Sequence, residues 1–135
     1  MSFSLVPESH IDLLQDEVRA YAYLATVMGD GTPQVTPVWF NTNEDFILIN
    51  STKGRVKDRN MRQRSFIAVV IQDPNNPFRY MQVRGRIVEI TEQDARQHIN
   101  ILAGKYTGKA EYTLNDPHEV RVIYMLRPEK TQVMG

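Results

Sequence analysis

Residues 21–40, YAYLATVMGDGTPQVTPVWF, have the pattern of two strands joined by a tight turn. Residues 21–28 are rich in the aromatic and β-branched types that favour strands. The next three residues, Gly29–Gly31, supply the positive φ angles that hairpin turns require. Pro33 and Pro37 in the returning run indicate edge or bulge positions, because proline cannot donate a hydrogen bond to a neighbouring strand. The stretch therefore predicts an antiparallel hairpin that spans residues 21–28 and 33–40.

The rest of the chain continues this β-rich pattern. The run of residues 66–71 is unbroken apolar, which is typical of a strand covered on both faces. In the long run 80–90, Gly85 coincides with a shift in the apolar alternation, which indicates a bulge or sharp bend. Further strands are expected at 46–50 and 120–126, and helices at 7–18, 53–64 and 91–106. Six antiparallel strands without βαβ alternation predict a mainly β (α+β) small barrel with peripheral helices.

Composition narrows the class of protein. The chain has 135 residues, a length typical of one domain, so we expect residues 1–135 to form a single unit. It has no cysteine, which excludes disulfides and thiolate metal sites. Its formal net charge is zero, which argues against a nucleic-acid partner. The start of the chain lacks the pattern of a signal peptide, and no apolar run approaches the ~20 residues of a membrane span. We expect a cytoplasmic protein without a membrane partner.

Motifs for self-sufficient catalysis are missing. No glycine-rich turn for a phosphate or dinucleotide joins a strand to a helix, and no serine lies in a nucleophile elbow. The histidines His10, His98 and His118 are isolated, so no metal site is expected. We therefore predict no catalytic side chain. If the chain is an enzyme, a bound cofactor carries the difficult chemical step.

The segment 53–64 has the most uneven charge in the chain. It holds six of the 16 basic residues and one acidic residue, Asp58, so its net charge is +5 and that of the remainder is −5. One interpretation is a solvated surface helix with salt bridges. The other is an anion site, because arginine and lysine bind phosphate and carboxylate groups. The segment contains no aromatic residue, which argues against binding of single-stranded nucleic acid.

Six motifs follow one another along almost the whole chain: Leu24–Val27, Asp30–Phe40, Ile49–Met61, Arg79–Ile87, Lys105–Gly108 and Arg121–Lys130. In this order they resemble the split β-barrel flavin and deazaflavin proteins related to pyridoxamine 5′-phosphate oxidase. The resemblance implies a six-stranded antiparallel split β-barrel of the FMN-binding type. Within that superfamily, the chain is most similar to the small reductases that depend on the deazaflavin coenzyme F-420.

The resemblance also implies a set of cofactor-binding residues. One group lies along the ring of the cofactor: Gln34, Val35, Thr36, Pro37, Val38 and Tyr80. A second group lies along the ribityl chain and phosphate: Asn50, Ser51, Thr52, Arg55, Lys57 and Asn60. Plain core packing remains an alternative for Val35, Val38 and Tyr80, a strand edge for Pro37, and a core or interface position for Trp39.

The implied activity is hydride transfer between F-420 and a small unsaturated organic substrate. FMN in the same groove is the alternative cofactor, and a non-catalytic flavin- or deazaflavin-binding protein is the alternative function. The resemblance further implies a homodimer with the cofactor at its interface. Vitamin B6 oxidation is not expected, because the second strand has no arginine or lysine and no long C-terminal arm follows Lys130.

Overall fold

The computed structural model describes residues 4–135; Met1–Phe3, on which the expectation about a signal peptide partly rests, lie outside this range. Seven strands form one antiparallel sheet in the order β2-β1-β5-β6-β7-β4-β3. The strands are β1 (Ala22–Val27), β2 (Pro33–Val38), β3 (Phe40–Asn43), β4 (Phe46–Thr52), β5 (Phe66–Gln72), β6 (Tyr80–Thr91) and β7 (Arg121–Met134). The helices are η1 (Glu8–Leu14), η2 (Asp16–Val18), α1 (Val56–Gln63) and α2 (Ala95–Thr107).

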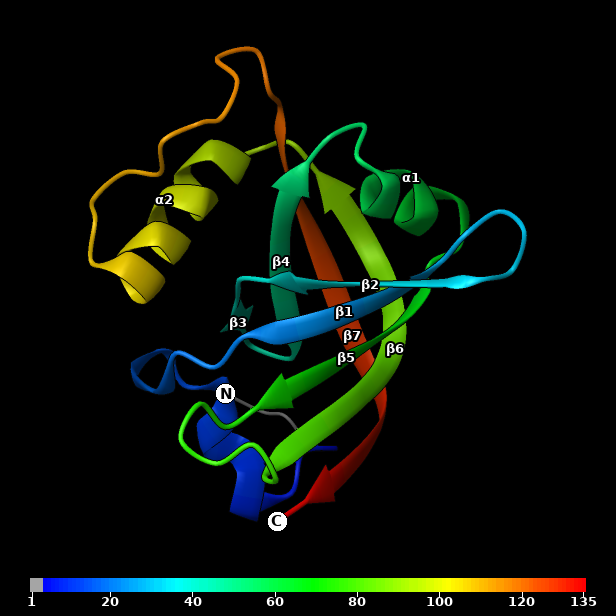
Figure 1. Ribbon diagram of the computed structural model, residues 1–135, viewed down its shortest axis with the longest axis vertical. Helices are drawn as coiled ribbons and strands as arrows, with labels where there is room; N and C mark the ends of the chain where they lie inside the picture. The colour runs from blue at the N-terminus through cyan, green and yellow to red at the C-terminus, as the bar shows by residue number, and fades with distance from the viewer. Residues whose placement is uncertain (1–3) are drawn as a thin grey trace.

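The sheet curls into an open barrel. In Figure 1, β2, β1 and β5 cross in front of β4 and β7, and the long strands β6 and β7 connect the two parts. The edge strands β2 and β3 are not hydrogen-bonded to each other, so the barrel is split. Apolar side chains from both parts fill the space between them, with Leu24, Ile49 and Tyr124 fully buried. This arrangement agrees with the expected split β-barrel.

The strand count is seven, whereas we expected six. We predicted one returning strand over residues 33–40, but the chain changes neighbours at Trp39. Residues up to Val38 pair with β1, and from Phe40 onward they pair with β4. The strand is therefore divided at the split itself, because its two halves bond to opposite edges of the sheet.

The expected irregularity at Gly85 is present. The pairing of β6 with β7 shifts register between Arg84 and Gly85, and again between Ile87 and Glu89. A Cβ at position 85 would lie 2.1 Å from the carbonyl oxygen of Arg127, so only glycine allows the two backbones to approach this closely. We predicted that the last strand ends at residue 126, but β7 continues to Met134. Pro128 is tolerated in β7 because it lies opposite Gly85, where the ladder is already interrupted.

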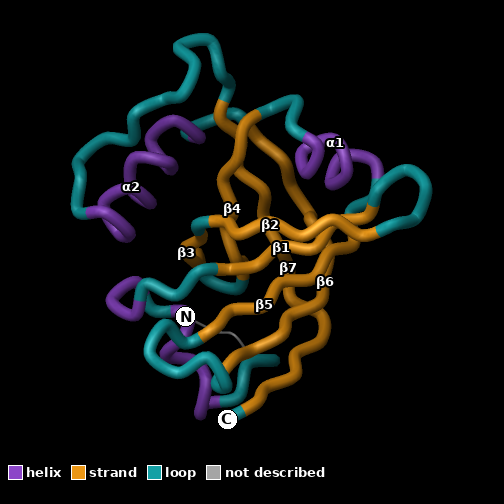
Figure 2. The backbone as a smooth tube through the Cα atoms, in the orientation of Figure 1, coloured by secondary structure: helices purple, strands orange, loops and turns teal. Residues whose placement is uncertain are grey.

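Strand β5 is covered on one face, whereas its sequence predicted cover on both. Ile67, Val69 and Ile71 are buried in the barrel. Phe66 on the opposite face is 52% exposed, and Val70 beside it is half-buried. In the view of Figure 2, no helix of the described residues packs over this outer face, so one face of the apolar strand is partly exposed to solvent.

The helices differ from their predicted bounds. The expected helix 7–18 is two 3₁₀ helices, because Gln15 has extended backbone angles that separate η1 from η2. Helix α1 begins at Val56 and not at residue 53, since residues 53–55 form a turn with Gly54 at φ +93°. Helix α2 packs Ile99, Leu102 and Ala103 inward, and α1 buries Met61. Within residues 4–135, no helix is long and apolar enough to cross a membrane.

Candidate cofactor-binding site

A groove of about 480 Å³ lies at the split, which is the size range of small-molecule and cofactor sites. Its lining comes from β1 and β2, the end of β4, helix α2, and residues 55–57 at the start of α1. Helices α1 and α2 lie on either side of the end of β4 (Figure 1). The lining residues are Tyr21, Tyr23, Pro37, Val38, Trp39, Asn50, Ser51, Arg55, Lys57, Ile99 and Tyr112. Six predicted site residues are therefore brought together here: Pro37, Val38, Asn50, Ser51, Arg55 and Lys57.

Asn50 is held by hydrogen bonds in all directions. Its Nδ2 donates to the carbonyl of Ala95 and to Nδ1 of His98, both at 3.0 Å. Its Oδ1 accepts a 2.8 Å hydrogen bond from Nε of Arg121. The other ring nitrogen of His98, Nε2, forms a hydrogen bond of 2.8 Å with Oδ1 of Asn41. This network joins β4, α2 and β7 behind the groove and holds the Asn50 side chain in one orientation.

The side chain of Ser51, unlike that of Asn50, lacks a hydrogen-bond partner in the described part of the chain. Its side chain is buried, with 3% of the residue exposed, and it lines the groove. The hydroxyl Oγ has no hydrogen-bond partner in residues 4–135. A buried hydroxyl without a partner is unfavourable, so such a group in a groove indicates contact with a ligand or water.

Two cations in the groove have no counter-ion. Nζ of Lys57 donates to Oγ1 of Thr36 at 3.1 Å, and Lys57 forms no ion pair within residues 4–135. Burial, followed by the charges of Arg55 and Arg121, lowers the pKa of Lys57. Arg55 is exposed and also forms no ion pair in the described part of the chain. Two unpaired cations beside an unpartnered hydroxyl favour an anionic ligand.

The other basic residues of the segment 53–64 do not line the groove. Lys53 pairs with Glu92 at 3.0 Å, and Arg62 pairs with Asp58 at 3.0 Å. Nε of Arg64 donates to the carbonyl of Val27 at 2.7 Å. Arg59 is exposed on α1. Both interpretations of this segment thus apply in part: two residues face the groove, and the others serve the surface and packing of α1.

A row of stacked aromatic rings lies beside the groove. Tyr106 stacks against both Tyr21 and Trp39, and the ring centroids of each pair lie 5.2 Å apart. The ring of Tyr112 meets Trp39 edge-on at 5.9 Å, and the guanidinium of Arg121 lies 5.1 Å from the centre of the Tyr112 ring. The sequence-based prediction had favoured a core or interface position for Trp39. It assigned no site role to Arg121 or to four lining residues from distant segments: Tyr21, Tyr23, Ile99 and Tyr112.

The other six predicted site residues do not line the groove. Thr36 is next to it through the hydrogen bond from Lys57. Val35 points outward from β2 and is 61% exposed. Oε1 of Gln34 accepts a 3.2 Å hydrogen bond from the Thr26 hydroxyl, and Asn60 also donates to Thr26, at 3.0 Å.

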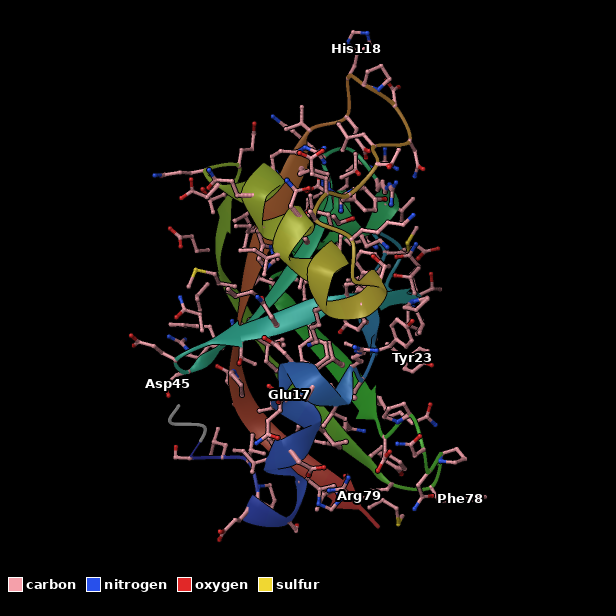
Figure 3. All side chains as sticks on the ribbon, turned by 90° about the vertical axis from the view of Figure 1, so that its left-hand side faces the viewer. Glu17, Tyr23, Asp45, Phe78, Arg79 and His118 are labelled. Carbon is pink, nitrogen blue, oxygen red and sulfur yellow. The ribbon has the colours of Figure 1, made fainter. Side chains whose placement is uncertain are left out.

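The remaining two predicted residues lie at strand ends: Thr52 is the last residue of β4, and Tyr80 is the first residue of β6. Oγ1 of Thr52 donates to Glu119 at 2.6 Å, behind the groove. Tyr80 begins β6 and pairs with Gln72 and Met134. Figure 3 shows the neighbouring Phe78 and Arg79 at the end of the molecule away from the tip marked by His118.

The open antiparallel barrel thus has, at its split, a groove lined by aromatic rings and by the cations Arg55 and Lys57. The family model described as pyridoxamine 5′-phosphate oxidase matches residues 14–134, and the chain belongs to this family. A comparison with curated proteins finds no match.

Solved structures support the same fold. A structure described as an F420 reductase is 33% identical, with a TM-score of 0.81, and the match covers 94% of this chain and 98% of the other. A conserved hypothetical protein from Mycobacterium tuberculosis is 21% identical, with a TM-score of 0.72 and coverage of 96% and 84%. General Stress Protein 26 from Bacillus anthracis is 14% identical, with a TM-score of 0.64 and coverage of 93% and 94%. The last two are similar in fold alone.

Proposed function

We propose that the chain is an oxidoreductase that binds coenzyme F-420 in the groove and transfers hydride between it and a small unsaturated organic substrate. Membership of the family and the 33% identity to an F420 reductase support a flavin-type cofactor. The observation that carries the proposal is the combination, in one groove, of unpaired cations, an unpartnered hydroxyl and stacked aromatic rings.

The residues of the groove fit a planar cofactor with an anionic tail. Lys57 and Arg55 would hold a phosphate group, because neither has a carboxylate partner in residues 4–135. The buried hydroxyl of Ser51 would gain the hydrogen bond that the protein does not provide. The aromatic rings of Trp39 and Tyr112 offer flat surfaces beside a ring system.

When bound, a reduced deazaflavin supplies the hydride. The protein's own contribution is positional, and no side chain is required as a nucleophile. Hydrogen bonds position the side chain of Asn50, and stacking on Tyr106 positions Trp39, so both lining residues are oriented by the protein itself. Orientation of two reactants by such a groove can lower a barrier by roughly 7–11 kcal/mol, so acid–base groups are not needed for a large rate enhancement.

We further propose a homodimer that completes the site. The outward side chains of β2, β1 and β5 form a continuous apolar face: Pro33, Val35, Pro37, Tyr23, Ala25, Val27, Phe66, Ala68 and Val70. Val35, Phe66 and Tyr23 are 61%, 52% and 37% exposed. An apolar face of this kind marks an interaction surface. Tyr23 and Pro37 belong to both the face and the groove, so a second copy on the face would border the groove.

FMN in the same groove is the second candidate. The net charge of +5 on the segment 53–64 favoured F-420, whose tail carries more negative charge than one phosphate. Because only Arg55 and Lys57 of that segment line the groove, the charge argument for F-420 is weaker than the sequence suggested. Identity to the F420 reductase is the observation that keeps F-420 first. A protein that binds a flavin or deazaflavin without turnover remains the alternative function.

A cytoplasmic location and the lack of a nucleic-acid partner remain predictions.

A side-by-side titration tests the proposal. The chain contains one tryptophan, Trp39, and it lines the groove, so its fluorescence reports occupancy directly. We expect F-420 and FMN each to quench Trp39 emission, with F-420 binding more tightly, and reduced F-420 to be oxidised when an enone or quinone is added. The variant Trp39→Phe should lose the signal while F-420 fluorescence still changes on binding. Tight binding of FMN alone would make FMN the cofactor, and failure of both to bind would refute the proposal.

A further inference from the structure

Arg121 on β7 lies directly behind the groove. Its guanidinium contacts two lining residues: Nε donates to Asn50 at 2.8 Å, and its carbon lies 5.1 Å from the centre of the Tyr112 ring. Only 6% of the Arg121 side chain is exposed.

Glu119 is the counter-ion of this buried arginine. Oε2 of Glu119 accepts hydrogen bonds from Nη1 of Arg121 at 3.3 Å and from the Thr52 hydroxyl at 2.6 Å. Oε1 accepts a 2.9 Å hydrogen bond from the backbone N–H of Asn115. The Glu119 side chain is only 4% exposed. Burial opposes its ionisation, but the hydrogen bonds from Thr52 and Asn115 and the charge of Arg121 outweigh burial and lower the pKa of Glu119.

We propose that Glu119 is a specificity-determining residue of the groove, because its carboxylate neutralises Arg121 and leaves Arg55 and Lys57 as the unpaired groove cations, among residues 4–135, that a bound anion would meet. This inference rests on the proposed function. It extends that function by assigning the charge preference of the site to a residue that does not line it.

The physical reason is the short range and low screening of the charges involved. Arg121 contacts Asn50 and Tyr112, which line the same groove as Lys57 and Arg55. The charge of Arg121 also lowers the pKa of Lys57, after the larger effects of burial and of Arg55. Behind the groove, water is largely excluded, so a charge there is screened less than one at the surface. A resident carboxylate therefore decides whether the anion-binding region carries two or three effective positive charges. A third positive charge would strengthen the binding of every ligand with an anionic group, and most of all that of the ligand with the most negative charge.

The test compares ligands that differ only in their anionic group. FMN is compared with riboflavin, and F-420 with the deazariboflavin that lacks the phosphate and tail. For each pair, we take the dissociation constant of the ligand without the anionic group and divide it by that of the ligand with it. A larger ratio means that the anionic group contributes more to binding. In Glu119→Gln we expect this ratio to increase about fivefold over wild type, because Arg121 becomes an unpaired cation. Glu92→Gln is the matched control: it removes the same charge from an exposed pair with Lys53, outside the groove, and should leave the ratio unchanged.

The double variant Glu119→Gln/Arg121→Met gives a second, independent test. It removes both charges of the pair, so the ratio should return to the wild-type value. If Glu119→Gln alone does not fold, since a buried unpaired arginine is destabilising, the double variant is compared with Arg121→Met. In Arg121→Met the carboxylate of Glu119 is left unpaired behind the groove, so its ratio should lie below that of the double variant, and equal ratios would overturn the inference. A ratio well below wild type in the double variant would show that Arg121 acts on the ligand despite Glu119, and would overturn the inference.

Other outcomes separate this inference from the proposed function. If Glu119→Gln weakens all four ligands equally, Glu119 only fixes the segment that carries Tyr112, and the inference is wrong. An equal rise of the ratio in Glu119→Gln and Glu92→Gln would show a general charge effect, which also overturns it. Failure of wild type to bind any of the four ligands would instead refute the proposed function.

Discussion

The hydroxyl of Tyr124 on β7 donates a 2.5 Å hydrogen bond to the carboxylate of Asp58 on α1. The same carboxylate accepts hydrogen bonds from Nε of Arg62 at 3.0 Å and from the backbone N–H of Gly54 at 2.9 Å. Asp58 is 2% exposed and Tyr124 is fully buried. The one acidic residue of the segment 53–64 therefore holds the turn and helix against the barrel. Lys57, the residue before Asp58, forms no ion pair within residues 4–135 and donates to Thr36 instead.

Removal of this hydrogen bond should destabilise the fold in a pH-dependent way. We expect Tyr124→Phe to lower the free energy of unfolding by about 1–3 kcal/mol at neutral pH, since the bond to a buried carboxylate is lost. Burial opposes ionisation of Asp58, but hydrogen bonds from Gly54, Tyr124 and Arg62 outweigh it and lower its pKa below 3.8. A lowered pKa stabilises the fold above the unfolded value, and this contribution is lost as the pH falls below about 4.

The difference between wild type and Tyr124→Phe should therefore shrink in acid. Urea denaturation at pH 7 and pH 3 measures it. An equal difference at both pH values would contradict the assignment of the bond to the ionised carboxylate.

Burial of His98 gives a second pH dependence. Burial, followed by the charge of Arg121, lowers the pKa of His98 from 6.5 to about 4. The unfolded chain thus binds more protons between these values, so stability should fall by roughly 3 kcal/mol as the pH falls from about 6.5 to 4. His98→Gln should remove this part of the pH profile. His118→Gln is the control, because His118 lies exposed at the tip of the connection from α2 to β7 (Figure 3). Identical pH profiles for wild type and His98→Gln would refute the prediction.

Gly85 should not tolerate a side chain. In Gly85→Ala the new Cβ would lie 2.1 Å from the Arg127 carbonyl oxygen, so the two strands must separate. We expect a loss of about 3 kcal/mol in the free energy of unfolding, measured by thermal or chemical denaturation. Gly29→Ala is the matched control, since a Cβ there would have no neighbour within 4 Å. Comparable stability of the two variants would show that β6 and β7 can separate at little cost.

Lys57 should contribute to cofactor binding through its charge. We expect Lys57→Met to weaken binding of F-420 or FMN by about 1.5–3 kcal/mol, which is the range for a hydrogen bond to a charged group. Riboflavin, which lacks the phosphate, should be affected much less. Arg59→Met removes a charge from the same helix at an exposed position outside the groove and should bind as wild type does. Equal losses for FMN and riboflavin would show that Lys57 acts on structure and not on the phosphate.

Much of the fold could be predicted because its signals are local. The turn at Gly29–Gly31, the alternation of the strands and the shift at Gly85 are properties of neighbouring residues. The division at Trp39 could not be predicted, because pairing of Val38 with β1 and of Phe40 with β4 depends on strands distant in sequence. The same holds for the site. A basic segment after Asn50–Thr52 predicted an anion-binding region, but α1 turns Asn60 toward Thr26 and away from the groove.

The sequence alone determined the β-rich class, the bend at Gly85 and the concentration of positive charge in one segment. Only the tertiary structure decided which charges remain available. Asp58 bonds to Tyr124, 66 residues away, and Glu119 bonds to Thr52, 67 residues away. Pairing of charges depends on distances in space, which the closure of the barrel sets and which spacing along the chain does not reveal. For the same reason, Tyr21, Trp39 and Tyr112 became one side of a groove only after their strands, helix and connecting segment had packed together.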